Sequence, residues 1–260
     1  DDRRAHERRT SSDGARDKTD EHDGVSYHWV PAIRVRPEMA EHHRKPEDEL
    51  LEQMYASHHR RDQSGGERLG QAFLETKRAQ RFSSWIGCEK NVLDLGCRDG
   101  TLTRHFTKGN RVVGVDVDGR ALAIAHKAYG IEVHRANLNA ALPFSDGSFD
   151  VVVLAETLEH LPYPLITLGE IQRVLRPRGG VIGNVPLFYH LHGRWRVLRG
   201  KRLDNDSTHC QYHSYDSLRN LLQQFFTIEA MVPLKGCRWA KYSMRLFARN
   251  VAFRCRKTES

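Results

Sequence analysis

The stretch that determines the fold is NVLDLGCRDG, residues 91–100. Its first five residues, Asn91–Leu95, have the length and the apolar character of a strand that is buried on both faces of a sheet. The glycines that follow permit a tight turn and let the backbone approach a ligand closely. A helix expected to begin at Thr101 would direct its N-terminus, which favours anionic groups, at the same place. This succession indicates the ligand-binding edge of an α/β sheet.

The chain beyond residue 100 continues to alternate between strands and helices. We expect strands at 111–115, 131–135, 149–155, 181–185, 226–232 and 245–255, and helices at 101–108, 120–129, 165–176 and after Ser214. Apolar strands that alternate with helices indicate a mostly parallel sheet with helices on both faces. Ligands of such sheets bind beyond the carboxyl ends of the strands.

The residues at this edge distinguish between two classes of ligand. A dinucleotide-binding loop needs glycine at its first, third and sixth positions, and these positions hold Gly96, Arg98 and Thr101. Asp94 at the strand end would repel a pyrophosphate but would pair with an ammonium group. Asp116, at the end of the next expected strand, can accept hydrogen bonds from both hydroxyls of a ribose. S-adenosylmethionine, which has an ammonium group and no phosphate, therefore fits better than NAD.

Several motifs together resemble those of class I S-adenosylmethionine-dependent methyltransferases. They are VLDLGCRDG (92–100), VGVD (113–116), LPF (142–144), DGSFDVV (146–152), ETLEHL (156–161) and RVLRPRGG (173–180). The resemblance covers about residues 67–255. It implies a Rossmann-like, seven-stranded, mostly parallel sheet with helices on both faces and an antiparallel final strand. It also implies an enzyme that uses S-adenosylmethionine.

The resemblance assigns six residues to the cofactor site. They are Asp94, Gly96, Gly100, Asp116, Asn137 and Leu138. Asp94 and the glycine loop would hold the methionine end, Asp116 the ribose, and Asn137 with Leu138 the adenine. Arg98 stands where the family's loop has its middle glycine. We expect the Arg98 side chain to face solvent rather than the carboxylate of the cofactor.

Candidate catalytic residues follow the fourth expected strand. Methyl transfer depends on proximity and orientation, and a hydroxyl acceptor also benefits from a base or a metal. Glu156, Glu159 and His160 have the spacing of one helical face, and two carboxylates with an imidazole could bind a divalent ion. The segment resembles that of metal-using quinone and small-RNA 2′-O-methyltransferases. It also occurs in metal-free members, so we expect no metal. The predicted catalytic residues are Glu156, His160 and His209.

Residues 186–213 interrupt the alternation and are expected to form an acceptor-side insertion. They combine aromatic and basic side chains, and His209 and His213 are candidate bases. Residues 194–257 hold fourteen Lys or Arg against four acidic residues, in a chain whose net charge is +8. The expected partner is a small-molecule acceptor, methylated on an oxygen of a sugar or glycan, a phenol or a natural product. A quinone or RNA 2′-O-methyltransferase and a non-catalytic binding module are the alternatives, so nucleic acid is possible but not favoured.

The organisation of the whole chain follows from composition. Residues 1–45 contain few apolar side chains and are predicted to be a disordered tail, residues 46–86 to be amphipathic lead-in helices, and residues 87–257 to be the methyltransferase domain. Leu50 and Met54 would share the inward face of the first lead-in helix, and a second helix at about 67–85 would turn Phe73 inward. The pairs His42–His43 and His58–His59 are expected to be solvated. No apolar run reaches the length of about 18 residues needed to span a membrane. Five cysteines without a CxxC pair favour a reducing cytoplasm, and the oligomeric state stays open.

Overall fold

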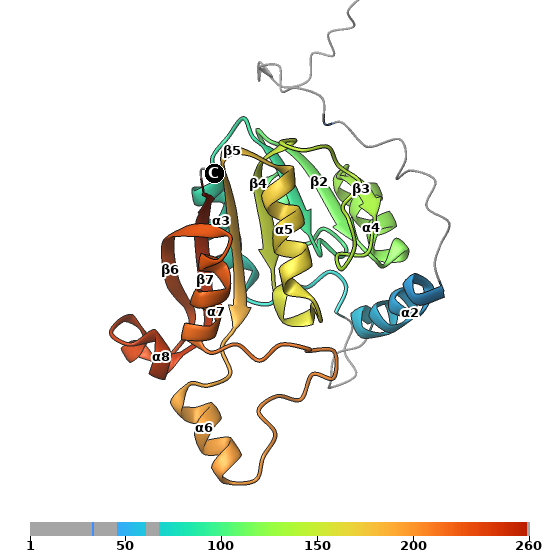
Figure 1. Ribbon diagram of the computed structural model, residues 1–260. Coiled ribbons are helices and arrows are strands. Elements are labelled where there is room, and N and C mark those ends of the chain that lie inside the picture. Colours follow the sequence, from blue (N-terminus) through green and yellow to red (C-terminus); the bar gives the residue numbers. More distant parts are fainter. Residues whose placement is uncertain (1–32, 34–45, 61–67, 259–260) are drawn as a thin grey trace, which may run out of the picture.

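The computed structural model describes residues 33, 46–60 and 68–258, and its centre is a seven-stranded sheet (Figure 1). The strands are β1 (Asn91–Leu95), β2 (Arg111–Asp116), β3 (Glu132–Arg135), β4 (Phe149–Ala155), β5 (Leu175–Pro186), β6 (Phe226–Gly236) and β7 (Ala248–Lys257). Their order is β3-β2-β1-β4-β5-β7-β6, and the first five strands pair in parallel. Strand β7 runs antiparallel to both β5 and β6. The predicted mostly parallel sheet is confirmed.

Helices follow the strands as the alternation predicts. The helices are α2 (Pro46–Arg60), α3 (Glu75–Ile86), α4 (Gly119–Tyr129), α5 (Pro164–Val174), α6 (Leu191–Leu198), α7 (Tyr215–Gln223) and α8 (Met244–Phe247). Short 3₁₀ turns are η1 (Thr103–Phe106), η2 (Leu158–His160) and η3 (Arg238–Lys241). Helix α4 begins at its cap Asp118, whose carboxylate accepts two backbone N–H groups, and ends at Gly130. Ser214 caps α7 as expected.

Two expected helices are shorter than the sequence indicates. The helix predicted at 101–108 is reduced to η1, where the Thr103 hydroxyl turns inward and donates to buried Asp94 at 2.6 Å. The helix predicted from residue 67 begins at Glu75, because Leu74 has a left-handed backbone (φ 50°) that no α-helix can include. Phe73, expected to be inward, is consequently 43% exposed.

The core lies on both faces of the sheet. Every residue of β1 is buried, and alternate residues serve opposite faces. Leu93 and Leu95 belong to the cluster that includes side chains of α5 and α7, whereas Val92 packs with Phe82 and Ile86 of α3. In Figure 1, α5 and α7 lie in front of the sheet and α3 lies behind it.

Helix α2 lies beside the edge formed by the carboxyl ends of the strands, where polar contacts hold it. Asn137 donates to Asp48 at 2.9 Å, Arg135 pairs with Glu52 at 3.2 Å, and the His59 ring contacts Asp118 at 3.0 Å. His59 is buried, so the expectation that His58 and His59 are solvated is wrong. Leu50 and Met54, expected to face inward, are 69% and 42% exposed.

The predicted tail lies outside the described residues except for Ile33, which is half-buried and packs against the larger core cluster. His42 and His43 also lie outside them. Within the described ranges, every helix is too short or too polar to span a lipid bilayer.

Two glycines with opposite surroundings test the packing. A Cβ on Gly183 of β5 would lie 2.2 Å from the Leu154 carbonyl oxygen and 2.6 Å from the Phe253 ring, whereas one on Gly169 of α5 would meet only Phe225 at 3.9 Å. We expect Gly183→Ala to lower the free energy of unfolding by about 1–3 kcal/mol. Gly169→Ala should raise it by roughly 0.5–1 kcal/mol, because alanine favours helix. Urea denaturation measures both, and equal effects of the two substitutions would contradict this packing.

Candidate active site

A cavity of about 530 Å³ opens at the carboxyl ends of β1, β2 and β4. Its wall combines the loop after β1, the end of β2, the segment after β3, the turn after β4, helix α2 and part of the insertion. All three predicted catalytic residues line it. Of the six predicted cofactor residues, only Gly100 is absent from the lining.

Asp94, the residue before the last of β1, has a buried carboxyl group with one oxygen available. One carboxyl oxygen accepts the Thr103 hydroxyl, and the other has no hydrogen-bond partner within the described ranges. Burial, more than any other influence, raises the pKa of Asp94 to about 6. A cationic ligand group would satisfy the open oxygen and stabilise the ionised form.

Asp116 is held by the backbone at the end of β2. Its two carboxyl oxygens accept the N–H groups of Arg98 and Asp118, each at 2.9 Å. These bonds fix the carboxylate against the loop after β1, and burial raises the pKa of this group as well. Each carboxyl oxygen has two lone pairs, so the fixed carboxylate can still accept bonds from a diol.

The glycines of the loop are required by close packing. Gly96 has φ +80°, and a Cβ there would lie 2.7 Å from the Thr157 hydroxyl. Gly100 has φ +75°, and its Cβ would lie 2.8 Å from Ile131. Gly100 therefore shapes the loop from outside the cavity, whereas Gly96 is part of the cavity wall.

The Arg98 side chain does not simply face solvent. Its guanidinium bonds the Gln71 carbonyl and Asp99, and its side chain is 22% exposed at the cavity wall. Asp99 in turn accepts the N–H of Gly70. Arg98 and Asp99 thus connect the loop after β1 to the segment before α3, which corrects the expectation of a solvated arginine.

Asn137 and Leu138 form the cavity wall after β3. The Asn137 amide nitrogen donates to Asp48 of α2, and its oxygen accepts the N–H of Asn139 at 2.9 Å. Leu138 offers its side chain to the cavity, while its carbonyl accepts the Thr167 hydroxyl at 2.7 Å. Both residues line the cavity, but the Asn137 amide is already bonded to α2.

Arg78 is a buried cation at the cavity that was not predicted from the sequence. Arg78 of α3 is 4% exposed, donates to the Phe73 carbonyl at 3.0 Å, and has its Nε without a partner in the described part of the chain. Its charge interacts with Glu156, Glu159 and Asp94. A buried guanidinium at a cavity wall suits the carboxylate of a ligand, and no motif in the sequence marks it.

Glu156 departs from the predicted helical face. Its backbone is left-handed (φ 60°), and it precedes the turn η2 instead of joining a helix. Its carboxylate accepts the side-chain amides of buried Asn184 and Asn250, the latter at 2.6 Å. The hypothesis that Glu156, Glu159 and His160 share a helical face is therefore wrong.

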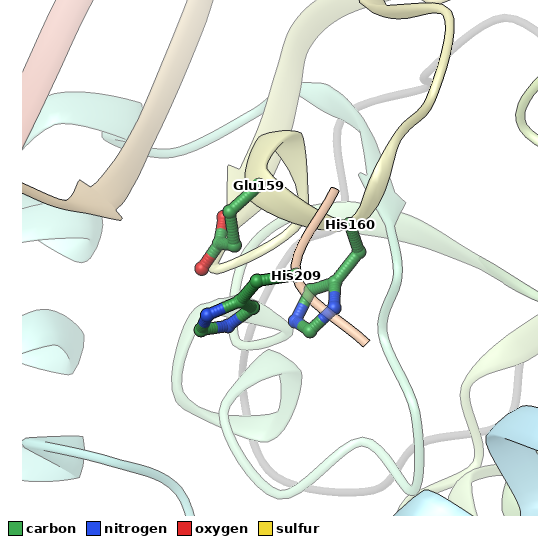
Figure 2. A group of neighbouring side chains, drawn as sticks. All are labelled: Glu159, His160 and His209. Carbon is green, nitrogen blue, oxygen red and sulfur yellow. The ribbon is translucent and has the colours of Figure 1, made fainter. Parts of the chain in front are cut away.

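His209 takes the place that Glu156 was expected to hold. Glu159, His160 and His209 lie together, with one ligand atom of each within 4.8 Å of the others (Figure 2). Burial raises the pKa of Glu159 well above its usual range, and burial with the neighbouring His209 and His58 lowers the pKa of His160 to about 3. The other candidate base, His213, does not line the cavity.

The insertion contributes less to the cavity than its composition indicates. Only Asp206 and His209 of residues 186–213 line it, and the basic residues of α6 do not. Tyr55 and His58 of α2 complete this end, where the Tyr55 hydroxyl donates to the His160 carbonyl at 3.2 Å. The carboxylate of Asp206, in the insertion, forms an ion pair with the Arg68 guanidinium at 3.2 Å.

The sheet and the cavity define the class I, Rossmann-like fold of S-adenosylmethionine-dependent methyltransferases. Residues 65–225, more than half of the chain, match the family described as "Methyltransferase domain". The chain belongs to this family, and residues 65–225 are its methyltransferase domain. The cofactor and the class of enzyme expected from the sequence are confirmed.

Similar proteins agree on the class and differ in their acceptors. Ubiquinone biosynthesis O-methyltransferase of Nitrosococcus oceani is 33% identical over 98 residues, 35% of this chain and 42% of that protein. Demethylmenaquinone methyltransferase of Thermus thermophilus is 38% identical over 100 residues, 36% and 46% of the two chains. This chain therefore matches less than half of either relative.

A solved structure shares the fold. The N-methyltransferase NodS from Bradyrhizobium japonicum WM9, in complex with S-adenosyl-L-homocysteine, is similar with a TM-score of 0.56. The match covers 79% of this chain and 98% of that one, at 18% identity. At this identity, the similarity supports a shared fold and does not identify the acceptor.

Asp94 should make cofactor binding depend on pH. Its pKa near 6 means that acid protonates the group that we expect to pair with the ammonium. Affinity for S-adenosylmethionine should be nearly constant from pH 7 to 7.5 and fall below pH 6, approaching about tenfold per pH unit. Calorimetry from pH 5 to 7.5, on protein shown by circular dichroism to be folded, measures this. Asp94→Asn should bind weakly with a flat profile, and a flat wild-type profile would contradict the assignment.

Arg78 should bind the carboxylate end of the cofactor. Arg78→Met keeps much of the volume and removes the charge, and we expect S-adenosylmethionine binding to weaken by about 1.5–3 kcal/mol. Arg81→Met, on the exposed side of the same helix, is the matched control. If both variants bind alike, Arg78 has only a structural role.

Proposed function

We propose that the chain methylates an oxygen of a small aromatic hydroxy compound, of the phenol or catechol class. The observation that carries this proposal is the cluster of Glu159, His160 and His209, because a hydroxyl acceptor needs help in losing its proton. S-adenosylmethionine supplies an electrophilic methyl group on a sulfonium. The residues of the chain have to hold the two reactants in line and receive the proton.

The proposed division of the cavity gives each end its own task. Asp94, Asp116 and Arg78 would hold the cofactor, and the acceptor would lie against His160 and His209. The Nδ1 atom of His209 contacts the Asp204 carboxylate, which fixes the ring and would stabilise positive charge next to the acceptor. Glu156, whose carboxylate is bonded by two amides, would contribute its fixed negative charge near the transferring methyl group.

One narrower acceptor group and one different class are to be tested. A quinone precursor is favoured by the name of the N. oceani relative and would be one member of the proposed class. RNA is favoured only by the basic C-terminal third. Arg194 and Arg196 lie on α6 and Arg199 at its C-terminal cap. All three are outside the cavity lining, so they provide no path for a phosphate backbone into the site.

A panel of acceptors tests the proposal. Methyl transfer to catechols, phenols and hydroquinones should exceed transfer to RNA or sugars, and binding of random RNA should be weak with a shallow salt dependence. His209→Ala should lower kcat/KM for the best hydroxylated acceptor by roughly 10²- to 10⁴-fold. His192→Ala, an exposed histidine of the same insertion, serves as the control. Efficient RNA methylation with steeply salt-dependent binding would replace the proposal by the nucleic-acid alternative.

A further inference from the structure

We propose that Asn184 and Asn250 are positioning residues, which hold the Glu156 carboxylate as the counter-charge of the sulfonium of S-adenosylmethionine. The sulfonium loses its positive charge when the methyl group leaves, so such a carboxylate would distinguish the cofactor from its product. Asn184 lies on β5 and Asn250 on the neighbouring antiparallel strand β7. Neither residue was predicted from the sequence.

The two side-chain amides converge on one carboxylate oxygen. The Nδ2 atoms of Asn184 and Asn250 both donate to Oε1 of Glu156, the second at 2.6 Å. Nδ2 of Asn184 also donates to Oδ1 of Asn250 at 3.0 Å, and its backbone carbonyl accepts the Glu156 N–H at 2.9 Å. The asparagines are 0% and 1% exposed. Asparagine is disfavoured in strands, and a buried network of this kind keeps the carboxylate in one orientation.

The backbone of Glu156 contributes to the same arrangement. Its left-handed conformation, with φ 60°, is costly for a residue with a side chain and is typical of functional sites. Glu156 lines the cavity, and both amides bond Oε1 and not Oε2. The second carboxylate oxygen is therefore available to a ligand in the cavity.

The turn that contains Glu156 lies against the loop expected to hold the methionine end of the cofactor. Strand β4 pairs with β1 as far as Leu154 and Leu95. The Thr157 hydroxyl donates to the Leu95 carbonyl at 2.9 Å, and a Cβ on Gly96 would lie 2.7 Å from that hydroxyl. Glu156 precedes Thr157, so it belongs to this end of the cavity and not to the end expected to bind adenine.

The charges at this end match those of the ligand in number and sign. Arg78 is a cation whose charge interacts with Glu156 and Asp94, and the methionine end of S-adenosylmethionine has one carboxylate, one ammonium and one sulfonium. With the carboxylate expected at Arg78 and the ammonium at Asp94, Glu156 is the group left for the sulfonium. Glu159 suits this role less, because burial raises its pKa well above its usual range and favours its uncharged form.

The consequence of this assignment is selective loosening of the product. In the transfer, the methyl carbon forms a bond to the acceptor and its bond to sulfur breaks. The electron pair of that bond stays on sulfur, which becomes neutral. Glu156 then loses its ionic partner, whereas Asp94 and Arg78 keep theirs. This difference is the same for every acceptor, so it rests on the use of S-adenosylmethionine and not on the proposed phenol.

Binding of S-adenosylmethionine and of S-adenosylhomocysteine tests the assignment without turnover. Calorimetry gives both dissociation constants for the wild type and for each variant. Glu156→Gln keeps the shape and removes the charge, so it should weaken S-adenosylmethionine binding by about 10- to 100-fold and S-adenosylhomocysteine binding by less than about twofold. Asn184→Leu and Asn250→Leu remove the amides, and each should weaken S-adenosylmethionine binding selectively, by about 3- to 10-fold.

A double-mutant cycle separates positioning from a general loss of structure. Asn250→Leu should have little further effect in the Glu156→Gln background, because it acts through that carboxylate. Asn91→Leu is the matched control, since Asn91 is a fully buried asparagine at the start of β1 and outside the cavity lining. It should lower the melting temperature and keep the wild-type ratio of the two dissociation constants. Melting curves show which variants fold, and half-buried Glu156→Gln tests the charge even if a leucine variant does not.

The ratio of the two dissociation constants decides the outcome. An unchanged ratio in Glu156→Gln would overturn the assignment of the counter-charge. Equal weakening of both ligands in the leucine variants would reduce Asn184 and Asn250 to a structural role. A shifted ratio in a protein that methylates no hydroxylated acceptor would reject the proposed function and keep this assignment.

Discussion

The parallel pairing of β1 with β2 on one side and β4 on the other is the constraint on which the rest of the structure depends. Leu95 pairs with Val115 and with Leu154, so the three strands end at the same level. Asp94, Asp116 and Glu156 thereby come to one edge from three distant parts of the sequence. The apolar pattern of the strands fixes this register, because slipping by one residue would move each side chain to the other face.

Polar contacts, rather than apolar packing, build the site upon this edge. Asp116 links two strand ends through backbone N–H groups, Asp99 links the loop after β1 to the segment before α3, and the Glu159 carbonyl links η2 to the insertion. Each of these groups is buried, where hydrogen bonds are stronger and a missing partner is costly. The unpartnered oxygens of Asp94 and Glu159 therefore stand out as places prepared for a ligand.

The parts of the site that could be predicted from the sequence are the local ones. The loop from Asp94 to Gly100 and the acid at Asp116 are contiguous with their strands, so strand positions and glycines were enough to place them. Contacts between distant parts of the chain could not be predicted from such local patterns. No feature of the sequence near Glu156 indicates the left-handed backbone that separates it from Glu159. Between His160 and His209 lie 48 residues of the chain, so their contact could not be predicted either. The polar contacts that hold α2 against the site were not predicted, because the apolar face of the helix was expected to make the contact. Arg78 was not predicted, because it belongs to no recognisable motif.

Helix α2 contacts both ends of the cavity. Asp48 binds Asn137 in the cavity wall and His59 contacts Asp118 at the start of α4, while Tyr55 and His58 lie at the end of the cavity that includes His160. A displacement of this helix that admits one ligand therefore also unseals the compartment of the other. Exchange of the cofactor would then be coupled to exchange of the acceptor, through contacts that all lie outside the sheet.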